Sequence, residues 1–385
     1  MKIYPQYDCI GSYGGTRCNQ LRLKDRAAML RNEILSMLNA KTAEERLGNL
    51  KIVLAEEREK PKVLPQYANN HIHTIYSFSP YSPTAAVWAA REAGLLTAGI
   101  MDHDSIAGGE EFRAAAEIAG IGVTCGFEMR VSLAGTPFEN KKTNNPDQNG
   151  IAYMAFHSVR REYFQKAEER LAPLRRLRNE RNRKMLIRIS EKTGISLDLE
   201  KDVIPLSMYS EGGAVTERHI LFALADRMLE NGGYMEKYDL LGKLKAEMMK
   251  DIYVPARDEL ISLDDADKLS NEIGAILCYP YLGDVTDSPT GDKSAAKFED
   301  GYLEELIAFL MERGVHFVTF APSRNTMAQL DKLMSLCREF GMGQISGEDI
   351  NSPRQSFICP QLSNPKFEHL VDAAWMLVNR EKDGA

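Results

Sequence analysis

The sequence has no apolar run close to the roughly 20 residues that a helix needs to span a bilayer. Its first residues, MKIYPQYDCIGSYGG, also lack the apolar core of a secretory signal, so secretion is not indicated. Cysteine is scarce, with 6 in 385 residues, and no two cysteines form a CxxC pair. The pattern argues against a disulfide scaffold and a cysteine-ligated zinc site, and we expect reduced thiols in a cytoplasmic protein without a membrane partner.

An excess of positive charge is also missing. The chain has 48 Lys and Arg against 55 Asp and Glu, which gives a net charge of −7 and argues against binding of a polyanion by the whole surface. Residues 160–192 are a local exception, with 12 basic and 5 acidic residues and a charge of +7. This segment suits an anionic ligand, although most of its arginines are expected on a solvated helix face. Nucleic acid is not expected, because no aromatic residues interleave within 165–192.

The pattern of hydrophobic residues divides the chain into four parts. Residues 1–65 contain a helical stretch over 20–60 and form an N-terminal extension, which serves as a contact between copies in a homo-oligomer or as a cover for the main domain. In 66–159 and 271–385, short apolar runs alternate with helical stretches. The part between them, 160–270, is helical and charge-rich, which indicates an inserted helical subdomain.

Alternation of strands and helices predicts an α/β fold with a parallel sheet, open or closed into a barrel. Helical stretches lie, for example, at 83–94 and 106–120. The strand-like runs fall at 68–75, 96–101, 122–133, 151–157, 273–279, 315–320 and 342–349.

Ionisable residues gather near the C-terminal ends of these runs, where barrels of alternating strands and helices carry their catalytic residues. His71 and His73 point to one face of their strand, because side chains two residues apart do so. Later runs contain or precede Asp102-His103-Asp104, Glu128, His157 and Glu348-Asp349.

Histidine and carboxylate ligands suit Zn, Mn or Fe, and a shared carboxylate such as Glu128 bridges two ions. We therefore predict one or two divalent ions at the barrel mouth. A lone histidine at a strand end is more often a hydrogen-bonded structural residue. We favour that interpretation for His219, His316 and His369.

The ordered set of motifs resembles the PHP family, the polymerase and histidinol phosphatase superfamily of metal-dependent phosphoesterases. The matching text is HIHTIYSFSPYSPTAAVWAAREAGLLTAGIMDHDSIAGGEEF, GVTCGFEMRV, MAFHSV and GEDINSPRQ. The resemblance covers 66–157 closely and 271–360 more loosely. The insertion, with AVTERHILFALADRMLENGGY, is similar to that of the subgroup that hydrolyses small nucleotide or nucleoside phosphates.

The resemblance implies a distorted, TIM-like (β/α)7 barrel with up to three metal ions in its mouth. Glu128 and His157 match two ligands of the second metal, and Tyr279 stands where that set has a histidine. His103 matches a ligand of the third metal. The ligands that match the first metal are His71, His73, Glu128 and Asp349.

Two further departures affect the third set, because Phe78 and Asn351 stand where the family has its remaining ligands. The first site is therefore intact, the second is partly intact and the third is depleted. Tyr279 would bind iron or manganese as a phenolate only if the ion lowered its pKa well below about 10. A neutral phenol that donates a hydrogen bond is the other interpretation of this residue.

These observations favour a metal-dependent hydrolase of a small-molecule phosphate ester, nucleotide-like or a sugar phosphate, in which metal-activated water attacks phosphorus. His103 serves as a ligand or as a general acid, and Asp102 is assigned to the catalytic centre or to a bracing role behind it. The candidate phosphate contacts are Arg218 first, then Arg181, Lys184 and Arg354.

Two alternatives remain open on the sequence alone. The first is a degenerate PHP protein that binds metal or a phosphorylated ligand without phosphatase activity, which the departures at Phe78, Tyr279 and Asn351 motivate. The second is a hydrolase of a non-phosphate bond, such as a carbon–nitrogen bond. The basic insertion argues mildly against this second alternative.

Overall fold

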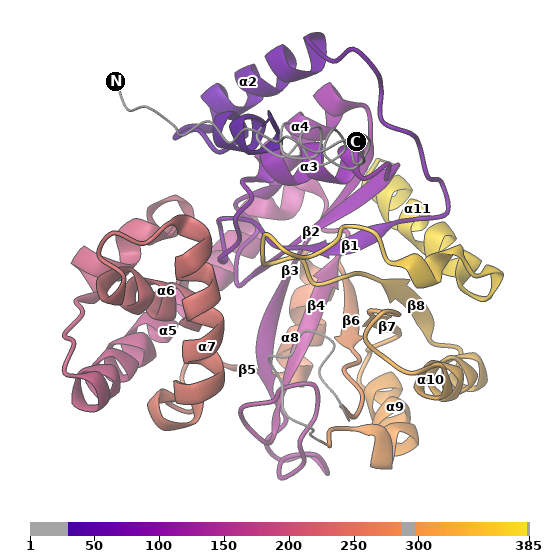
Figure 1. Cartoon of the computed structure of the whole chain (residues 1–385). Helices are drawn as coiled ribbons and strands as arrows, with labels where there is room; N and C mark the ends of the chain where they lie inside the picture. Colours follow the sequence, from indigo (N-terminus) through magenta and orange to yellow (C-terminus); the bar gives the residue numbers. More distant parts are fainter. Residues whose placement is uncertain (1–29, 286–296, 383–385) are drawn as a thin grey trace, which may run out of the picture.

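The computed structural model describes residues 30–285 and 297–382, and in this part of the chain eight strands form one sheet at the centre of the molecule (Figure 1). The strand order is β1-β2-β3-β4-β6-β7-β8, and the short strand β5 pairs with β3. The strands are β1 (Asn69–Ile72), β2 (Thr97–His103), β3 (Gly122–Ser132), β4 (Ile151–His157), β5 (Ile261–Ser262), β6 (Ile276–Pro280), β7 (Phe317–Phe320) and β8 (Gly343–Ser346).

The sheet curls into a barrel that closes between β1 and the segment after β8. The amide of His73 donates to the carbonyl of Ile350 at 3.0 Å, and the amide of Ile350 donates to the carbonyl of His71 at 3.1 Å. Gly347 permits this approach, because a Cβ at that position would lie 2.5 Å from the Cβ of His71. The predicted TIM-like barrel of seven main strands is confirmed.

The prediction of an all-parallel sheet is wrong at β4. This strand runs antiparallel to both β3 and β6, with Ala155 opposite Glu128. Residues 133–150 join β3 to β4 without an intervening helix, and strands joined by a direct loop pair in antiparallel fashion. His157, at the end of β4, therefore lies deeper in the barrel than Glu128 does.

Helices cover the outer surface of the barrel. They often begin at side-chain caps: Ser82 accepts from the amide of Ala85 at the start of α3, and Thr326 and Gln329 form a capping box on α10. No helix within residues 30–285 and 297–382 has the length and hydropathy to cross a membrane. The helices are α3 (Pro83–Glu92), α4 (Gly109–Ala119), α8 (Leu263–Glu272), α9 (Leu303–Glu312), α10 (Met327–Phe340) and α11 (Glu368–Lys382).

One end of the barrel interior is filled by α11. Leu377 of this helix packs with Met101, Cys278 and Ile345, which belong to β2, β6 and β8. The hydroxyl of Ser158, just beyond β4, donates to the carbonyl of Leu377 at 3.1 Å. The interior is thus a packed core at this end, so a ligand reaches it only from the other end, the mouth.

The described part of the N-terminal extension covers the barrel. Residues 30–38 are helical, α2 spans Ala43–Ala55, and Leu38 and Leu50 are buried in the main core. Arg46 donates from Nε to Glu111 of α4 at 2.8 Å in a buried ion pair. The extension therefore acts as a cover, while the homo-oligomer stays a prediction. The part of that prediction that falls on 1–29 lies outside the described residues, as does the expectation of reduced thiols at Cys9 and Cys18.

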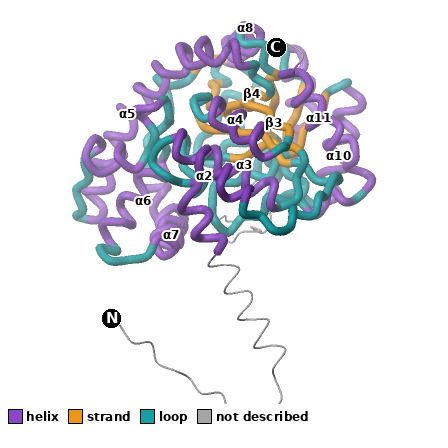
Figure 2. Tube along the Cα trace, turned by 90° about the horizontal axis from the view of Figure 1, so that it is seen from above, coloured by secondary structure: helices purple, strands orange, loops and turns teal. Residues whose placement is uncertain are grey.

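The insertion carries α5 (Phe164–Thr193), α6 (Glu217–Met228) and α7 (Tyr234–Ile252), and these helices lie beside the barrel (Figures 1 and 2). It has an apolar core of its own, which runs from Met185 to Ile252. The first turns of α5 and the whole buried face of α8 pack in the barrel core instead. The separate core is therefore shorter than the predicted 160–270.

Buried ion pairs dock the insertion on the barrel. Arg178 of α5 donates to Asp104, just after β2, at 2.5 Å and to Glu217 of α6 at 2.6 Å. Arg181 pairs with Glu217 and with Glu259, and Arg130 of β3 lies 3.4 Å from Glu217. Several of the basic residues of 160–192 are thus neutralised inside the protein.

We expect Arg178→Met to destabilise the protein by about 3–5 kcal/mol, because Asp104 and Glu217 would be left as buried charges with one cation fewer. Urea denaturation measures this free energy of unfolding. Arg183→Met is the matched control, because Arg183 of the same helix pairs with Glu200 at the surface and should contribute less than about 1 kcal/mol. Equal effects of the two substitutions would contradict the docking role.

Candidate metal centre

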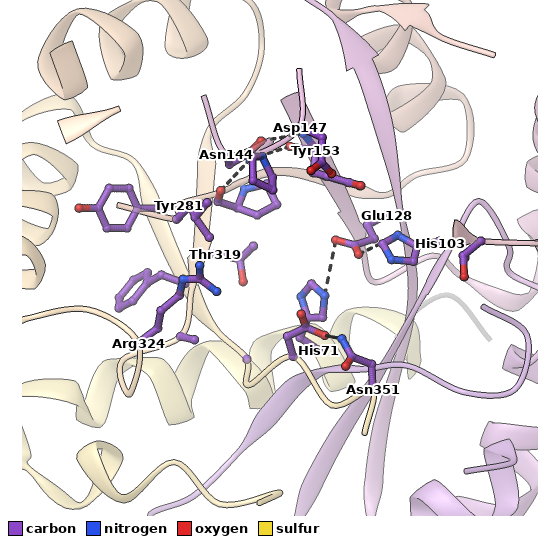
Figure 3. Close-up of a pocket in the computed structure, with 18 of the residues that line it drawn as sticks. His71, His103, Glu128, Asn144, Asp147, Tyr153, Tyr281, Thr319, Arg324 and Asn351 are labelled. Carbon is purple, nitrogen blue, oxygen red and sulfur yellow. Dashed lines mark hydrogen bonds and ion pairs between the residues drawn. The ribbon is translucent and has the colours of Figure 1, made fainter. Parts of the chain in front are cut away.

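A buried carboxylate, Glu128, lies among three imidazoles at the barrel mouth, two of which, those of His71 and His103, are seen in Figure 3. His71 Nε2 and His73 Nε2 each lie 3.5 Å from one of its oxygens, and His103 Nδ1 lies 2.9 Å from Oε1. Ligand atoms of His71, His73 and Glu128 all fall within 4.8 Å of one another. These three residues, on β1, just after it and on β3, therefore have the spacing to hold one metal ion.

The charges of this cluster are strongly coupled. Burial alone would raise the pKa of Glu128, but the imidazoles of His103 and His71 hold it well below its usual value. Burial alone would lower the pKa of His71, and the Glu128 carboxylate more than offsets this and raises it. The site therefore favours a carboxylate that is paired with positive charge, which is the condition a divalent ion also meets.

Asp349 approaches the cluster from the segment after β8. Its Oδ1 lies 3.2 Å from His73 Nε2 and accepts from Asn351 Nδ2 at 2.6 Å. Its side chain is 56% exposed, so this carboxylate faces the pocket. The imidazole of His73 outweighs the desolvation of the carboxyl and holds the pKa of Asp349 well below its usual range.

The ring orientation of His73 is fixed from behind. Its Nδ1 lies 3.1 Å from the hydroxyl of Ser77, and that hydroxyl donates to Asp102 at 2.6 Å. The amide and hydroxyl of Thr74 also donate to Asp102. Because the Ser77 proton is used on Asp102, its oxygen accepts from Nδ1–H, which leaves Nε2 as the ligand atom.

Asp102 is therefore a positioning residue, which corrects its catalytic assignment and agrees with the bracing role that was the other interpretation. It is 1% exposed and does not line the pocket, because the side chain points toward the β1 loop rather than into the mouth. Burial raises its pKa, although hydrogen bonds from Ser77 and Thr74 oppose the shift. Its function is to hold Ser77 and, through it, His73.

His157 lies behind the cluster and is 0% exposed. Neither of its ring nitrogens has a hydrogen-bond partner among the described residues, which is costly for a buried polar group. Burial, with a further contribution from His71, lowers its pKa to about 3, so the ring is neutral. A neutral, buried and unpartnered imidazole near Glu128 fits a second metal ion, which these two residues would share.

Tyr279 does not belong to the site. Its ring packs in the main core, and its hydroxyl accepts from the amide of Asn144 at 3.1 Å. Burial raises its pKa well above the usual value, which disfavours a phenolate. Alternation along β6 directs Tyr279 outward, whereas Pro280 lines the pocket. The prediction that Tyr279 ligates metal is therefore wrong.

The positions that would complete a third metal site do not fit an ion. Phe78 packs against His219, Phe222 and Tyr238 of the insertion. The side-chain oxygen of Asn351 accepts from Arg218. Of the third set, His103 alone has a side chain that suits a divalent metal and a place in the pocket.

The four residues that were predicted to contact phosphate lie in different places in the structure. Arg218, at the start of α6, lines the pocket. Arg181 is buried in the docking network, so its prediction as a substrate contact is wrong. Lys184 is exposed on α5, and Arg354 pairs with Asp239 of α7 at 2.8 Å; neither lines the pocket. Those two predictions are also contradicted.

The pocket has a volume of about 240 Å³ and several lining residues that were not predicted. Arg324 follows β7 by four residues, so the strand-end rule applied to the other runs would have found it. Lys245 and the loop before β4 carry no such signal, because the insertion and a long loop bring them to the mouth. The unpredicted polar residues are Asn144, Asp147, Tyr153, Thr216, Glu217, Lys245, Tyr281, Thr319 and Arg324.

The remaining histidines lie in structural or surface positions. His219 caps α6, since its Nδ1 accepts from the amide of Thr216 at 3.0 Å. Burial lowers its pKa to about 3. His316 and His369 are exposed and do not line the pocket.

Solved structures of known proteins share this architecture. An assumed metal-dependent phosphoesterase from Bifidobacterium adolescentis matches with a TM-score of 0.56 and 20% identity, over 79% of this chain and 96% of that chain. An amidohydrolase from Chromobacterium violaceum, solved with bound sulfate and no metal, matches with a TM-score of 0.56 and 19% identity, over 80% and 96%. The chain shares the fold of these two structures.

The fold of this chain matches known proteins through structure, whereas its sequence matches no family model. No protein-family model and no curated protein matches the sequence at a significant level. At about 20% identity the comparison concerns the fold alone. The chemistry of this barrel therefore has to be argued from its own side chains at the mouth.

We expect Asp102→Asn to weaken metal binding by about 10–100-fold, because an amide cannot accept all the hydrogen bonds that fix Ser77 and His73. Competition with a chromophoric chelator measures the affinity for Mn²⁺ or Zn²⁺. Asp239→Asn, an exposed carboxylate outside the pocket, is the control and should leave the affinity unchanged. Unchanged affinity in Asp102→Asn would contradict the bracing role.

The raised pKa of His71 predicts that metal affinity depends on pH. Below that pKa the ring carries a proton that the metal must displace, so affinity should fall by about tenfold for each further pH unit. Above that pKa the ring is neutral and this dependence should level off. Titration calorimetry from pH 5 to pH 8 tests it, and an affinity that stays constant over this range would refute the assignment.

Proposed function

We propose that this protein is a metal-dependent hydrolase that cleaves a phosphate ester of a small molecule. The observation that carries the proposal is the set of His71, His73 and Glu128 within ligand distance of one another, with the unpartnered ring of His157 behind them. The mouth opens into a pocket that carries cationic side chains. Metal ligands and anion-binding groups thus face one small volume.

A bound divalent ion would lower the pKa of a water and polarise phosphoryl oxygens. The protein's own residues would hold the substrate. Arg218, Lys245 and Arg324 approach the pocket from α6, α7 and the segment after β7. Guanidinium groups match the geometry of phosphoryl oxygens and bind them in a bidentate manner, which supports an anionic substrate.

His103 is the residue we assign to the leaving group. Its Nδ1 faces Glu128 at 2.9 Å, and its ring lines the pocket, partly exposed. An imidazole that is held by a carboxylate on one nitrogen donates or accepts a proton at the other, and such transfer assists departure of an alkoxide. His103 would therefore act as a general acid.

The shape of the pocket limits the substrate to a small molecule. Its volume is about 240 Å³, and Tyr153, Tyr281 and Phe320 form part of its wall. Aromatic side chains beside cationic ones suit a leaving group with an apolar face, such as a nucleoside or an aryl alcohol.

Binding without turnover is the second candidate function. It is favoured by the third metal position, where Phe78 and Asn351 supply no suitable ligand. In this case the pocket would hold a phosphorylated ligand and signal its presence to a partner. The two candidates differ in whether phosphate is released.

The test is release of inorganic phosphate from a panel of nucleotide, sugar and aryl phosphates, with protein loaded with Mn²⁺, Zn²⁺ or Fe²⁺. We expect turnover of at least one ester, and a loss of about 100-fold or more in kcat/KM for Glu128→Gln and for His73→Ala, because both remove metal-binding groups. His316→Ala, an exposed histidine, is the matched control and should retain full activity.

Absence of phosphate release from every ester, with saturable binding of the same compounds, would favour the binding protein. Hydrolysis of amides or carboxylic esters in place of phosphate esters would overturn the choice of bond. Equal rates for the parent protein and for Glu128→Gln would show that the activity does not come from this site.

A further inference from the structure

We propose that the guanidinium of Arg218 supplies the positive charge that a third metal ion would otherwise bring, so that this centre binds at most two ions. The inference rests on the proposed function, since it concerns how the same site holds a phosphoryl group. It starts from the third metal position, where the residues of this chain do not match the ligands that the resemblance implies. Both residues that replace expected ligands there, Phe78 and Asn351, contact Arg218.

The ring of Phe78 packs into the insertion and does not point toward the metal cluster. Its ring centroid lies 5.0 Å from that of His219 and 5.5 Å from that of Tyr238, within the apolar core of the insertion. Its backbone has a φ of 97°, which is unfavourable for an aromatic residue. Packing of the ring holds this conformation, so the loop is built around the aromatic side chain.

Arg218 lies against both replaced positions. Its Cζ is 5.9 Å from the centroid of the Phe78 ring, a distance at which a cation is attracted to an aromatic face. Its Nη1 donates to the backbone carbonyl of Asn351 at 3.1 Å and also to the Asn351 side-chain oxygen. One guanidinium is therefore tied to the residues where two ligands would stand.

Asn351 connects this guanidinium to the metal cluster. Its side-chain oxygen accepts from Arg218, and its Nδ2 donates to Asp349 Oδ1 at 2.6 Å. Asp349 in turn lies 3.2 Å from His73 Nε2. The amide orientation is fixed at both ends by these two bonds. Arg218 is thus positioned at the edge of the metal cluster and lines the pocket.

The guanidinium of Arg218 carries a permanent positive charge, which makes it a suitable replacement for a metal ion. A guanidinium remains protonated at any physiological pH and cannot dissociate, and it repels a further cation nearby. It also binds two phosphoryl oxygens at once, as a metal ion does in such a site. In this arrangement His103 is not needed as a metal ligand, which leaves it for proton transfer.

The first arm of the test counts metal ions. Protein would be stripped with a chelator, reloaded with Mn²⁺ or Zn²⁺, passed through a desalting column and analysed by plasma mass spectrometry, with calorimetric titration of the stripped protein beside it. We expect two ions or fewer per chain. Three tightly bound ions would overturn the inference even if the protein hydrolyses phosphate esters.

The second arm measures binding of inorganic phosphate to the metal-loaded protein. Arg218→Met should weaken this binding by about tenfold or more, because a charged hydrogen-bonding group is lost. Arg218→Lys should restore much of the affinity, since it keeps the charge. The control is Arg354→Met, an arginine that pairs with Asp239 outside the pocket, which should bind phosphate like the parent protein.

The metal content of the Arg218 variants distinguishes a role of this residue in phosphate binding from a structural role. Arg218→Met and Arg218→Lys should load as many ions as the parent, with unchanged far-ultraviolet circular dichroism. Phosphate affinity in Arg218→Met equal to that of the parent would overturn the inference, as would restoration by Lys no better than by Met. Two bound ions with phosphate binding but no ester turnover would sustain the inference and refute the proposed hydrolase.

Discussion

The negative charge of Glu128, buried at the barrel mouth, is the constraint around which the site is arranged. A buried carboxylate is stable only when positive charge or hydrogen-bond donors surround it. Here the surrounding groups are the imidazoles of His71, His73 and His103, brought in by β1 and β2. Titratable imidazoles can exchange protons for a metal ion, whereas lysine or arginine in their place would give a permanently neutralised pair. The arrangement around this one carboxylate thus suits a divalent cation.

A second set of buried charges determines what lies opposite the metal cluster. Glu217 is held by Arg178 and Arg181 of α5, and Arg130 of β3 approaches the same carboxylate. Glu217 is the first residue of α6, so the network that docks the insertion also places the next residue, Arg218, at the pocket. The basic character of the insertion therefore contributes to the pocket through positioning. Few of its basic side chains line the pocket themselves.

The loop after β1 joins these two systems. Ser77 in this loop orients His73 toward the metal cluster, and Phe78, the next residue, is inserted into the apolar core of the insertion. A shift of the insertion would therefore be transmitted to a metal ligand through adjacent residues of one loop. The insertion and the metal cluster are therefore structurally coupled. Packing of Phe78 in the insertion helps to hold the loop in which Ser77 orients His73.

The sequence by itself determined the barrel and the identity of the metal cluster. Hydrophobic alternation located its seven main strands, and the strand-end rule found His71, His73 and Glu128, because side-chain direction along a strand is a local property. Tertiary structure decided what local patterns do not encode. Antiparallel pairing set the depth of His157, alternation within β6 turned Tyr279 outward, and long-range ion pairs removed Arg181 from the pocket. Packing of the insertion beside the barrel brought Lys245 of α7 to the pocket. These outcomes depend on which distant groups neutralise or pack against one another, and that is settled only when the whole chain folds.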